Sequence, residues 1–279
     1  MRQILTLLLT TALIGSSYAQ KFHLNLFGGA SNYQGDLQSK RFTFSQARLA
    51  YGGGLSYELT DRIMLKTGIT LGKITADDKL NPKNPSRNLN FTSRIAEVQL
   101  VGEYYLRGMN DFPLSPYVFG GVAIFHYNPY TYDSTGAKVY LRPLSTEGQG
   151  FYNNKKSYSL TQISIPFGAG VKLTLTDNIH VGAEIGLRKT FTDYLDDVST
   201  AYVDKDLLLS NRGQQAVALA YRTSELKNGA PYPAGGTQRG SAKYKDLYYF
   251  SGITLSFRLG AGDHYFNKHS LTRCPRRLG

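Results

Sequence analysis

The chain has 279 residues and a formal net charge of +12, with 29 glycines, 21 tyrosines, 14 phenylalanines and a single cysteine. One cysteine excludes a fold held together by internal disulfides. A basic balance can indicate nucleic-acid binding, but the basic residues are scattered and no recognition helix can be drawn. Anionic lipid headgroups, lipopolysaccharide or an acidic protein surface are the partners that we expect for an exported chain of this charge.

The N-terminal residues have the features of a cleavable secretory signal. Arg2 supplies a positive charge, residues 4–14 form a short apolar run, and Ser17, Tyr18 and Ala19 give the small-x-small pattern of a cleavage site. The run is too short to span a bilayer as a helix, which needs about 20 residues. We therefore predict a signal peptide over 1–19, a barrel over 20–259 and a basic periplasmic tail over 260–279.

Period-two alternation of apolar and polar residues is the main structural signal of the mature chain. It is clearest over 94–106 and 162–175, and each run has at least the 9–11 residues that a tilted transmembrane strand needs. Weaker copies occur along the rest of the chain. The predicted strands cover 21–33, 47–58, 62–73, 90–106, 116–127, 159–176, 178–191 and 245–259.

The links between these strands alternate in length. Residues 59–61 and 176–178 form tight turns and 107–115 is modestly longer, whereas 34–46, 74–89, 128–158 and 192–244 are long. A barrel with both ends in the periplasm has short turns there and long loops outside. We therefore predict an all-β fold, a transmembrane antiparallel up-and-down barrel of about eight strands. A soluble lipocalin-like barrel is the rival architecture, and it would place apolar side chains inside.

Charged side chains on the inner face of the predicted strands are the first candidate site. Eight strands leave an interior that side chains can fill, so opposite charges there should pair rather than line a channel. A solute or proton path is the alternative interpretation. The predicted inward residues are Lys66, Glu97, Glu103, Lys172, His180, Glu184, Arg188 and Arg258.

The sequence gives no catalytic or metal-binding pattern that outweighs a structural interpretation. His126 is the one candidate general base at the outer end of a strand, but no serine partner can be paired with it. Asp193, Asp196 and Asp197 offer carboxylates to a cation such as Ca²⁺, but their spacing matches no EF-hand loop. We expect these three aspartates to be solvated loop charges, and we expect no cofactor, no metal and no enzymatic activity.

The predicted tail is basic and carries the only cysteine. It is a candidate docking segment for a periplasmic partner, and its thiol is either unpaired or part of an intermolecular contact. The residues concerned are Lys268, Arg273, Cys274, Arg276 and Arg277.

Several segments resemble the PorG family, the outer-membrane barrel component of the type IX secretion system of Bacteroidota. They are NYQGDL at 32–37, RPLSTEGQG at 142–150, LRKTFTDYLDDVS at 187–199, and RG at 239–240 followed by KDLYYF at 245–250. The resemblance covers nearly the whole mature chain. It implies a non-enzymatic barrel that anchors a periplasmic ring of PorK and PorN, with PorM, to the outer membrane.

Two other functions stay open at the level of the sequence. One is a generic structural or adhesive barrel of the OmpA transmembrane type, since this fold hosts many functions. The other is a lipid-modifying barrel enzyme that uses His126 as its base.

Overall fold

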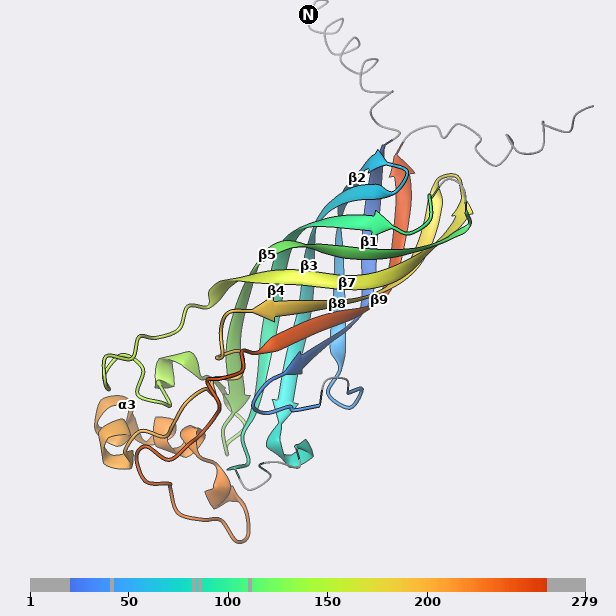
Figure 1. Cartoon of the computed structure of the whole chain (residues 1–279). Coiled ribbons are helices and arrows are strands. Elements are labelled where there is room, and N and C mark those ends of the chain that lie inside the picture. The colour runs from blue at the N-terminus through green and yellow to red at the C-terminus, as the bar shows by residue number, and fades with distance from the viewer. Residues whose placement is uncertain (1–20, 41–42, 82–83, 85–86, 110–111, 260–279) are drawn as a thin grey trace, which may run out of the picture.

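The computed structural model describes residues 21–40, 43–81, 84, 87–109 and 112–259, and it is a closed barrel of eight antiparallel strands (Figure 1). This confirms the predicted fold class. The predicted signal peptide and tail lie outside the described residues. The barrel strands are β1 (Phe22–Gln34), β2 (Arg48–Thr60), β3 (Ile63–Asp77), β4 (Asn90–Tyr105), β5 (Leu114–Tyr132), β7 (Thr161–Thr176), β8 (Ile179–Thr190) and β9 (Leu247–Leu259).

The strands pair in chain order and the sheet closes on itself. Its order is β4-β3-β2-β1-β9-β8-β7-β5, and a β4–β5 ladder joins the two edges. Phe22 lies opposite Leu259, so both ends of the described strands meet at one end of the barrel. Closure pairs the strand edges, which a barrel needs if it is to lie in lipid.

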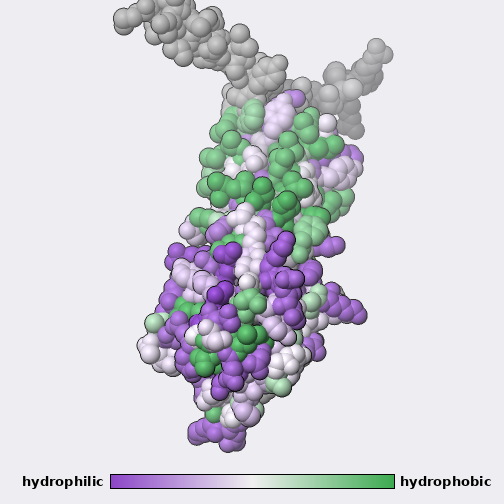
Figure 2. All heavy atoms as spheres, turned by 90° about the vertical axis from the view of Figure 1, so that its left-hand side faces the viewer, coloured by the Kyte–Doolittle hydropathy of each residue, from purple (hydrophilic) through white to green (hydrophobic). Residues whose placement is uncertain are grey.

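The burial pattern shows which face of each strand looks outward. On β4, Glu97 is fully buried whereas its neighbour Val98 is 55% exposed, and the alternation continues along the strand. Large apolar side chains cover the outer face, and the lumen holds the charged side chains of the strands together with a buried cluster that includes Met64, Val101 and Phe119. An apolar outer face is typical of a membrane barrel and is the reverse of a soluble one. Figure 2 shows the hydrophobic surface gathered around the barrel and the hydrophilic surface around the long loops. Among the described residues, no helix is long and apolar enough to cross a membrane.

Short turns close one end of the barrel. Thr60 and Thr176 make the same local contact at the tight turns, because each hydroxyl accepts hydrogen bonds from the backbone N–H groups two and three residues on. The ladder shifts register at both turns, between Glu58 and Thr60 and between Thr174 and Thr176. These residues therefore set where the neighbouring strands reverse.

The long links at the other end are more structured than the sequence indicates. They contain η1 (Asp78–Leu80), β6 (Lys138–Tyr140), η3 (Arg142–Leu144), α3 (Lys205–Ala220) and η4 (Thr223–Glu225). The sequence-based interpretation missed both β6, which pairs with β5, and α3. Asp204 caps α3 by accepting hydrogen bonds from the backbone N–H groups of Asp206 and Leu207.

Two strands also run further than predicted. β3 reaches Asp77 because it continues to pair with β4, and β5 reaches Tyr132 because it pairs with β4 as far as Tyr130 and with β6 over its last residues. This extension carries the sheet into the loop layer. Together with α3 and the loops it forms what we call the outer cap, at the lower left of Figure 1.

Candidate functional site

The charged residues inside the barrel form ion pairs across the lumen. The Lys66 ammonium lies 3.3 Å from the Glu103 carboxylate and 3.2 Å from that of Glu184, and Lys172 lies 3.7 Å from Glu103. Tyr117 donates a hydrogen bond of 2.8 Å to Glu184. Each carboxylate therefore meets a cation or a hydroxyl donor, as burial of a charge requires.

A second interior group lies nearer the outer cap. The Arg188 guanidinium binds Glu97 at 3.0 Å and also donates to the side-chain oxygen of Gln99. Tyr248 donates a hydrogen bond of 2.6 Å to the same Glu97 carboxylate. These contacts hold three strands together through one buried carboxylate.

A third group lies at the short-turn end. Arg258 pairs with Glu58 at 2.9 Å. The His23 and His180 rings lie 5.5 Å apart at that end. The inward residues predicted from alternation therefore do face the lumen, and most of them pair with an opposite charge.

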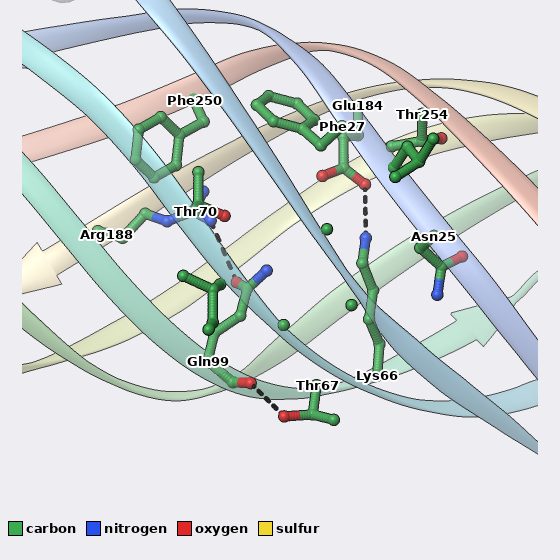
Figure 3. Close-up of a pocket in the computed structure, with 15 residues that line it drawn as sticks. Asn25, Phe27, Lys66, Thr67, Thr70, Gln99, Glu184, Arg188, Phe250 and Thr254 are labelled. Atoms are coloured by element: carbon green, nitrogen blue, oxygen red, sulfur yellow. Dashed lines mark hydrogen bonds and ion pairs between the residues drawn. The ribbon is translucent and has the colours of Figure 1, made fainter.

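These side chains leave little open space in the lumen. Figure 3 shows Lys66 from β3, Gln99 from β4, and Glu184 and Arg188 from β8 reaching inward around one cavity. That cavity has a volume of about 20 Å³, which holds about one water molecule. The ion pairs and this small cavity support the filled-lumen interpretation of the interior charges.

The outer cap is organised around a buried carboxylate, Glu147. It accepts hydrogen bonds from the backbone N–H groups of Ser199 and Thr200 and from the Thr200 hydroxyl at 2.6 Å. It also pairs with Arg239 at 3.1 Å. The Arg239 guanidinium in turn donates to the backbone oxygen of Asp197. Three loop segments are thus joined through one charge pair.

A second buried group holds two carboxyls against one phenol. Tyr33 lies 2.6 Å from Asp196 and 3.1 Å from Asp246 through its hydroxyl oxygen. The hydroxyl has one hydrogen, so it can donate to only one carboxylate; the other carboxyl must carry a proton to form its bond. Burial raises the pKa of both Asp196 and Asp246 well above the ordinary value. Repulsion from Asp36 adds to this effect at Asp196, and repulsion from Asp196 adds to it at Asp246.

The prediction that the three aspartates of 193–197 are solvated is wrong. Asp193, Asp196 and Asp197 are at most 3% exposed. Asp193 accepts a hydrogen bond from the Ser199 hydroxyl, and Asp197 accepts from Thr146 and Tyr158. Burial raises the pKa of Asp193 to about 7 and that of Asp197 to about 6. In the described part of the chain, no His, Cys, Asp and Glu side chains are grouped to hold a metal ion.

Glycines fit tightly into this arrangement. A Cβ on Gly35 would collide with the Asp246 carboxyl and the Tyr33 hydroxyl, and a Cβ on Gly240 would collide with the Asp36 carboxyl. Asp36 itself accepts a hydrogen bond of 2.9 Å from the backbone N–H of Ser241. Only glycine lets these two loops approach the carboxyls of Asp246 and Asp36 so closely.

Several segments that are far apart in the sequence meet in this one part of the molecule. Segment 32–37 supplies Tyr33, Gly35 and Asp36, segment 142–150 supplies Glu147, and segment 187–199 supplies the buried aspartates. Segments 239–240 and 245–250 supply Arg239 and Asp246. We name the set of Tyr33, Asp36, Glu147, Asp193, Asp196, Asp197, Arg239 and Asp246 the cap cluster.

Sequence reasoning did not single out Tyr33, Glu147, Arg239 or Asp246 as site residues. Their charged or phenolic groups stand in segments rich in glycine and turn residues, which are typical of exposed loops. The repeated pairing of a glycine with an acidic residue, as in Gly35-Asp36 and Glu147-Gly148, is the signal that was available.

The cap also holds an open cavity of about 620 Å³. Its walls include Asp36, Arg87, Tyr202, Tyr221 and Arg239. Arg87 forms a bidentate pair with Asp78 at 2.8 Å, so its guanidinium is already engaged. The cavity lies among polar loop residues of the cap.

His126 lies apart from the cap cluster. Its ring is exposed on the barrel exterior and its Nδ1 lies 3.0 Å from the Thr161 hydroxyl. Within the described ranges, no serine or carboxylate is bonded to this ring. The predicted tail residues Lys268, Arg273, Cys274, Arg276 and Arg277 lie outside the described residues.

Comparison with known proteins gives several solved structures and one family. No curated protein matches the chain. Among solved structures it is similar to Neisserial surface protein A, at 11% identity and a TM-score of 0.43, over 85% of this chain and 96% of that one. Similar values hold for OprG of Pseudomonas aeruginosa (10%, 0.39, 86% and 97%) and for Ail of Yersinia pestis in complex with a heparin analogue (9%, 0.39, 85% and 98%).

A family model matches residues 2–208, which is most of the chain. That model describes DUF6089, a domain of unknown function. The protein therefore belongs to the DUF6089 family.

Proposed function

We propose that this protein is a non-enzymatic outer-membrane barrel of the type IX secretion machinery of Bacteroidota, which anchors a periplasmic ring of PorK and PorN, with PorM, to the outer membrane. The observation that carries the proposal is the cap cluster. Segments that resemble the PorG family are far apart in the sequence, yet they assemble into one buried network. Such assembly is expected when a resemblance reflects a shared three-dimensional structure.

The surface of the barrel supports an outer-membrane location. Large apolar side chains on the outer face are 47–58% exposed on neighbouring strands, among them Ile69, Val98, Leu100, Val122 and Ile124. In water this surface would be costly, at about 25 cal/mol per Å² of apolar area. In a bilayer the same surface is solvated by acyl chains, so the barrel would sit across the membrane with its cap outside the cell.

The face toward the ring would then be the short-turn end. Asp61 and Asn178 lie in the tight turns of that end, and the chain leaves the barrel there after Leu259. The basic tail that we predict over 260–279 would then lie in the periplasm. An acidic face on a ring protein is the partner surface that this charge fits.

A tagged purification tests the proposal. The tag is inserted in the exposed part of α3, where it replaces nothing in the barrel, and the protein is extracted from outer membranes with a mild detergent. Recovery of PorK and PorN in fixed ratio supports the anchor. Recovery of the barrel alone, from cells that still assemble the ring, contradicts it. A matched variant that ends at Leu259 should fold equally well and recover less of the ring.

A second candidate is a generic barrel whose cap binds a ligand at the cell surface. The cap cavity of about 620 Å³ is the observation that favours it. Deletion of the gene distinguishes the two functions. Loss of the anchor should stop secretion by the type IX system, whereas loss of a generic surface barrel should weaken the envelope or adhesion and leave secretion intact.

A further inference from the structure

A groove runs along the outside of the barrel wall where β2, β3, β4 and β5 leave the apolar band. It has a volume of about 670 Å³. Its lining combines the cationic and imidazole groups of Arg48, Lys73, Arg94 and His126 with the apolar surfaces of Tyr51, Leu71 and Ala96. The groove is therefore amphipathic, with positive charge beside an apolar wall.

Two of its cations are directly opposed. Lys73 on β3 is the register partner of Arg94 on β4, and both belong to the outward-facing set of their strands. Opposed residues of an antiparallel pair have Cβ atoms about 4.5–5.5 Å apart, and like charges there repel. The fold holds these two charges together although the pair is unfavourable on its own.

The structure does not neutralise this charge from within. In the described part of the chain, no carboxylate forms an ion pair with Arg48, Lys73, Arg94 or the nearby Lys138. Lys138 instead lies 4.0 Å from the ring centroid of Tyr130 and donates a hydrogen bond to the Tyr140 hydroxyl. Lys138 is the register partner of Tyr132 on β5, and β5 also pairs with the strand that carries Arg94, so both charges lie on this side of the barrel.

The position of the charges relative to the apolar band identifies the kind of ligand. Leu71 lies opposite Ala96, and Ile69 lies opposite Val98, so the apolar wall begins two residues from the Lys73–Arg94 pair. Two residues of a strand span about 6.6 Å. A molecule that binds both the cation pair and the apolar wall must carry a negative group a short distance from hydrocarbon chains.

We propose that this groove binds a phosphorylated lipid of the outer leaflet, with a phosphate between Lys73 and Arg94 and an acyl chain along Leu71 and Ala96. The proposal rests on the outer-membrane location of the barrel, and it is independent of the secretion role. Phosphate accepts charge-assisted hydrogen bonds from both an ammonium and a guanidinium. It would also remove the repulsion between the two opposed cations.

The test uses the full mature chain, folded in detergent, and native mass spectrometry with diphosphorylated lipid A as the probe. The key variant is the double substitution Lys73→Gln and Arg94→Gln. Lys189→Gln is the matched control, because Lys189 is an exposed outward-facing cation of β8 that does not line the groove. Folding of each variant is checked first by its migration on unheated gels.

The proposal expects saturable binding of diphosphorylated lipid A that weakens about tenfold or more in the double variant and is unchanged in the control. Lipid A stripped of its phosphates should bind as weakly to the native chain as the intact lipid binds to the double variant. Equal affinity for the two lipids, or equal loss in the Lys189 control, would overturn the proposal. Displacement of the lipid by millimolar inorganic phosphate would show a plain anion site instead, and would also overturn it.

A second measurement distinguishes failure of the lipid-binding proposal from failure of the outer-membrane assignment. A chain that folds in detergent but does not insert into lipid vesicles would contradict the outer-membrane assignment. A chain that inserts and shows no preference for phosphorylated lipid would contradict only the groove.

Discussion

The Arg239 guanidinium and the Glu147 carboxylate lie 3.1 Å apart although 92 residues separate them in the chain. Both side chains are at most 2% exposed. The pair joins the loop between β5 and β7 to the loop between β8 and β9, so the cap is held by charges that the solvent does not reach. A buried pair of this kind becomes costly when one partner is removed.

Glu147→Ala should therefore loosen the cap and leave the barrel intact. Removal of one partner of a buried pair costs about 3–5 kcal/mol, because Arg239 is left without its main counter-charge. Limited proteolysis of the loops should speed up strongly, while migration of the folded barrel on unheated gels stays unchanged. Glu225→Ala is the control, since the Arg222–Glu225 pair has a carboxylate side chain that is 37% exposed and should contribute about 1 kcal/mol or less.

Gly35→Ala should disturb the same cap by a different route. The new methyl group would meet the Tyr33 hydroxyl and the Asp246 carboxyl, which already share hydrogen bonds. Overpacking of a buried site costs about 1–3 kcal/mol. Hydrogen exchange of the backbone N–H of Leu195, which donates to Asp246, should become faster. Gly28→Ala has open space around it and should leave that exchange unchanged.

Glu97→Ala should destabilise the barrel itself. It leaves the Arg188 guanidinium and the Tyr248 hydroxyl without their shared acceptor inside the lumen. The expected cost is again about 3–5 kcal/mol, measured as a lower urea midpoint for loss of strand circular dichroism. The double variant Glu97→Ala with Arg188→Ala should recover part of this loss. A double variant no more stable than the single one would show that the pair is not coupled.

The cap should be more stable in mild acid than at alkaline pH. Burial raises the pKa of Asp193 from 3.8 to about 7, so the folded state binds its proton more tightly than the unfolded state. This contribution is fully present below pH 3.8 and is lost as the pH rises through about 7. Near-UV circular dichroism of the cap tyrosines should give a higher urea midpoint at pH 5 than at pH 8. Asp193→Asn should reduce the difference.

The barrel was predictable because its wall obeys a local rule. Each spanning residue faces either lipid or lumen, so alternation such as Glu97, Val98, Gln99 and Leu100 is visible without any knowledge of partners. The short turns were predictable for the same reason, since they separate runs of opposite direction. The inward-facing charges are predicted from the alternation of side chains along each strand alone.

The cap was not predictable because its order depends on contacts between distant segments. The sequence around Asp197 is typical of a solvated loop. Only the fold brings Arg239 and Tyr158, which are distant in the chain, into contact with it. Helix α3 has no clear apolar stripe, and Gly213 inside it adopts φ +82°, so its sequence resembles a loop. Burial of α3 against the cap, rather than its own propensity, stabilises it.

The orientation of the barrel in the membrane is the claim on which the proposed function depends, and cysteine labelling in intact cells measures it most directly. Cys274 is first replaced by serine, and single cysteines are introduced at the exposed Gln214 in the cap or at the exposed Asp61 in a short turn. A membrane-impermeant maleimide should label the Gln214→Cys protein in intact cells and the Asp61→Cys protein only after the outer membrane is permeabilised. The opposite pattern, or labelling of both positions in intact cells, would contradict a barrel that spans the outer membrane with its cap outside.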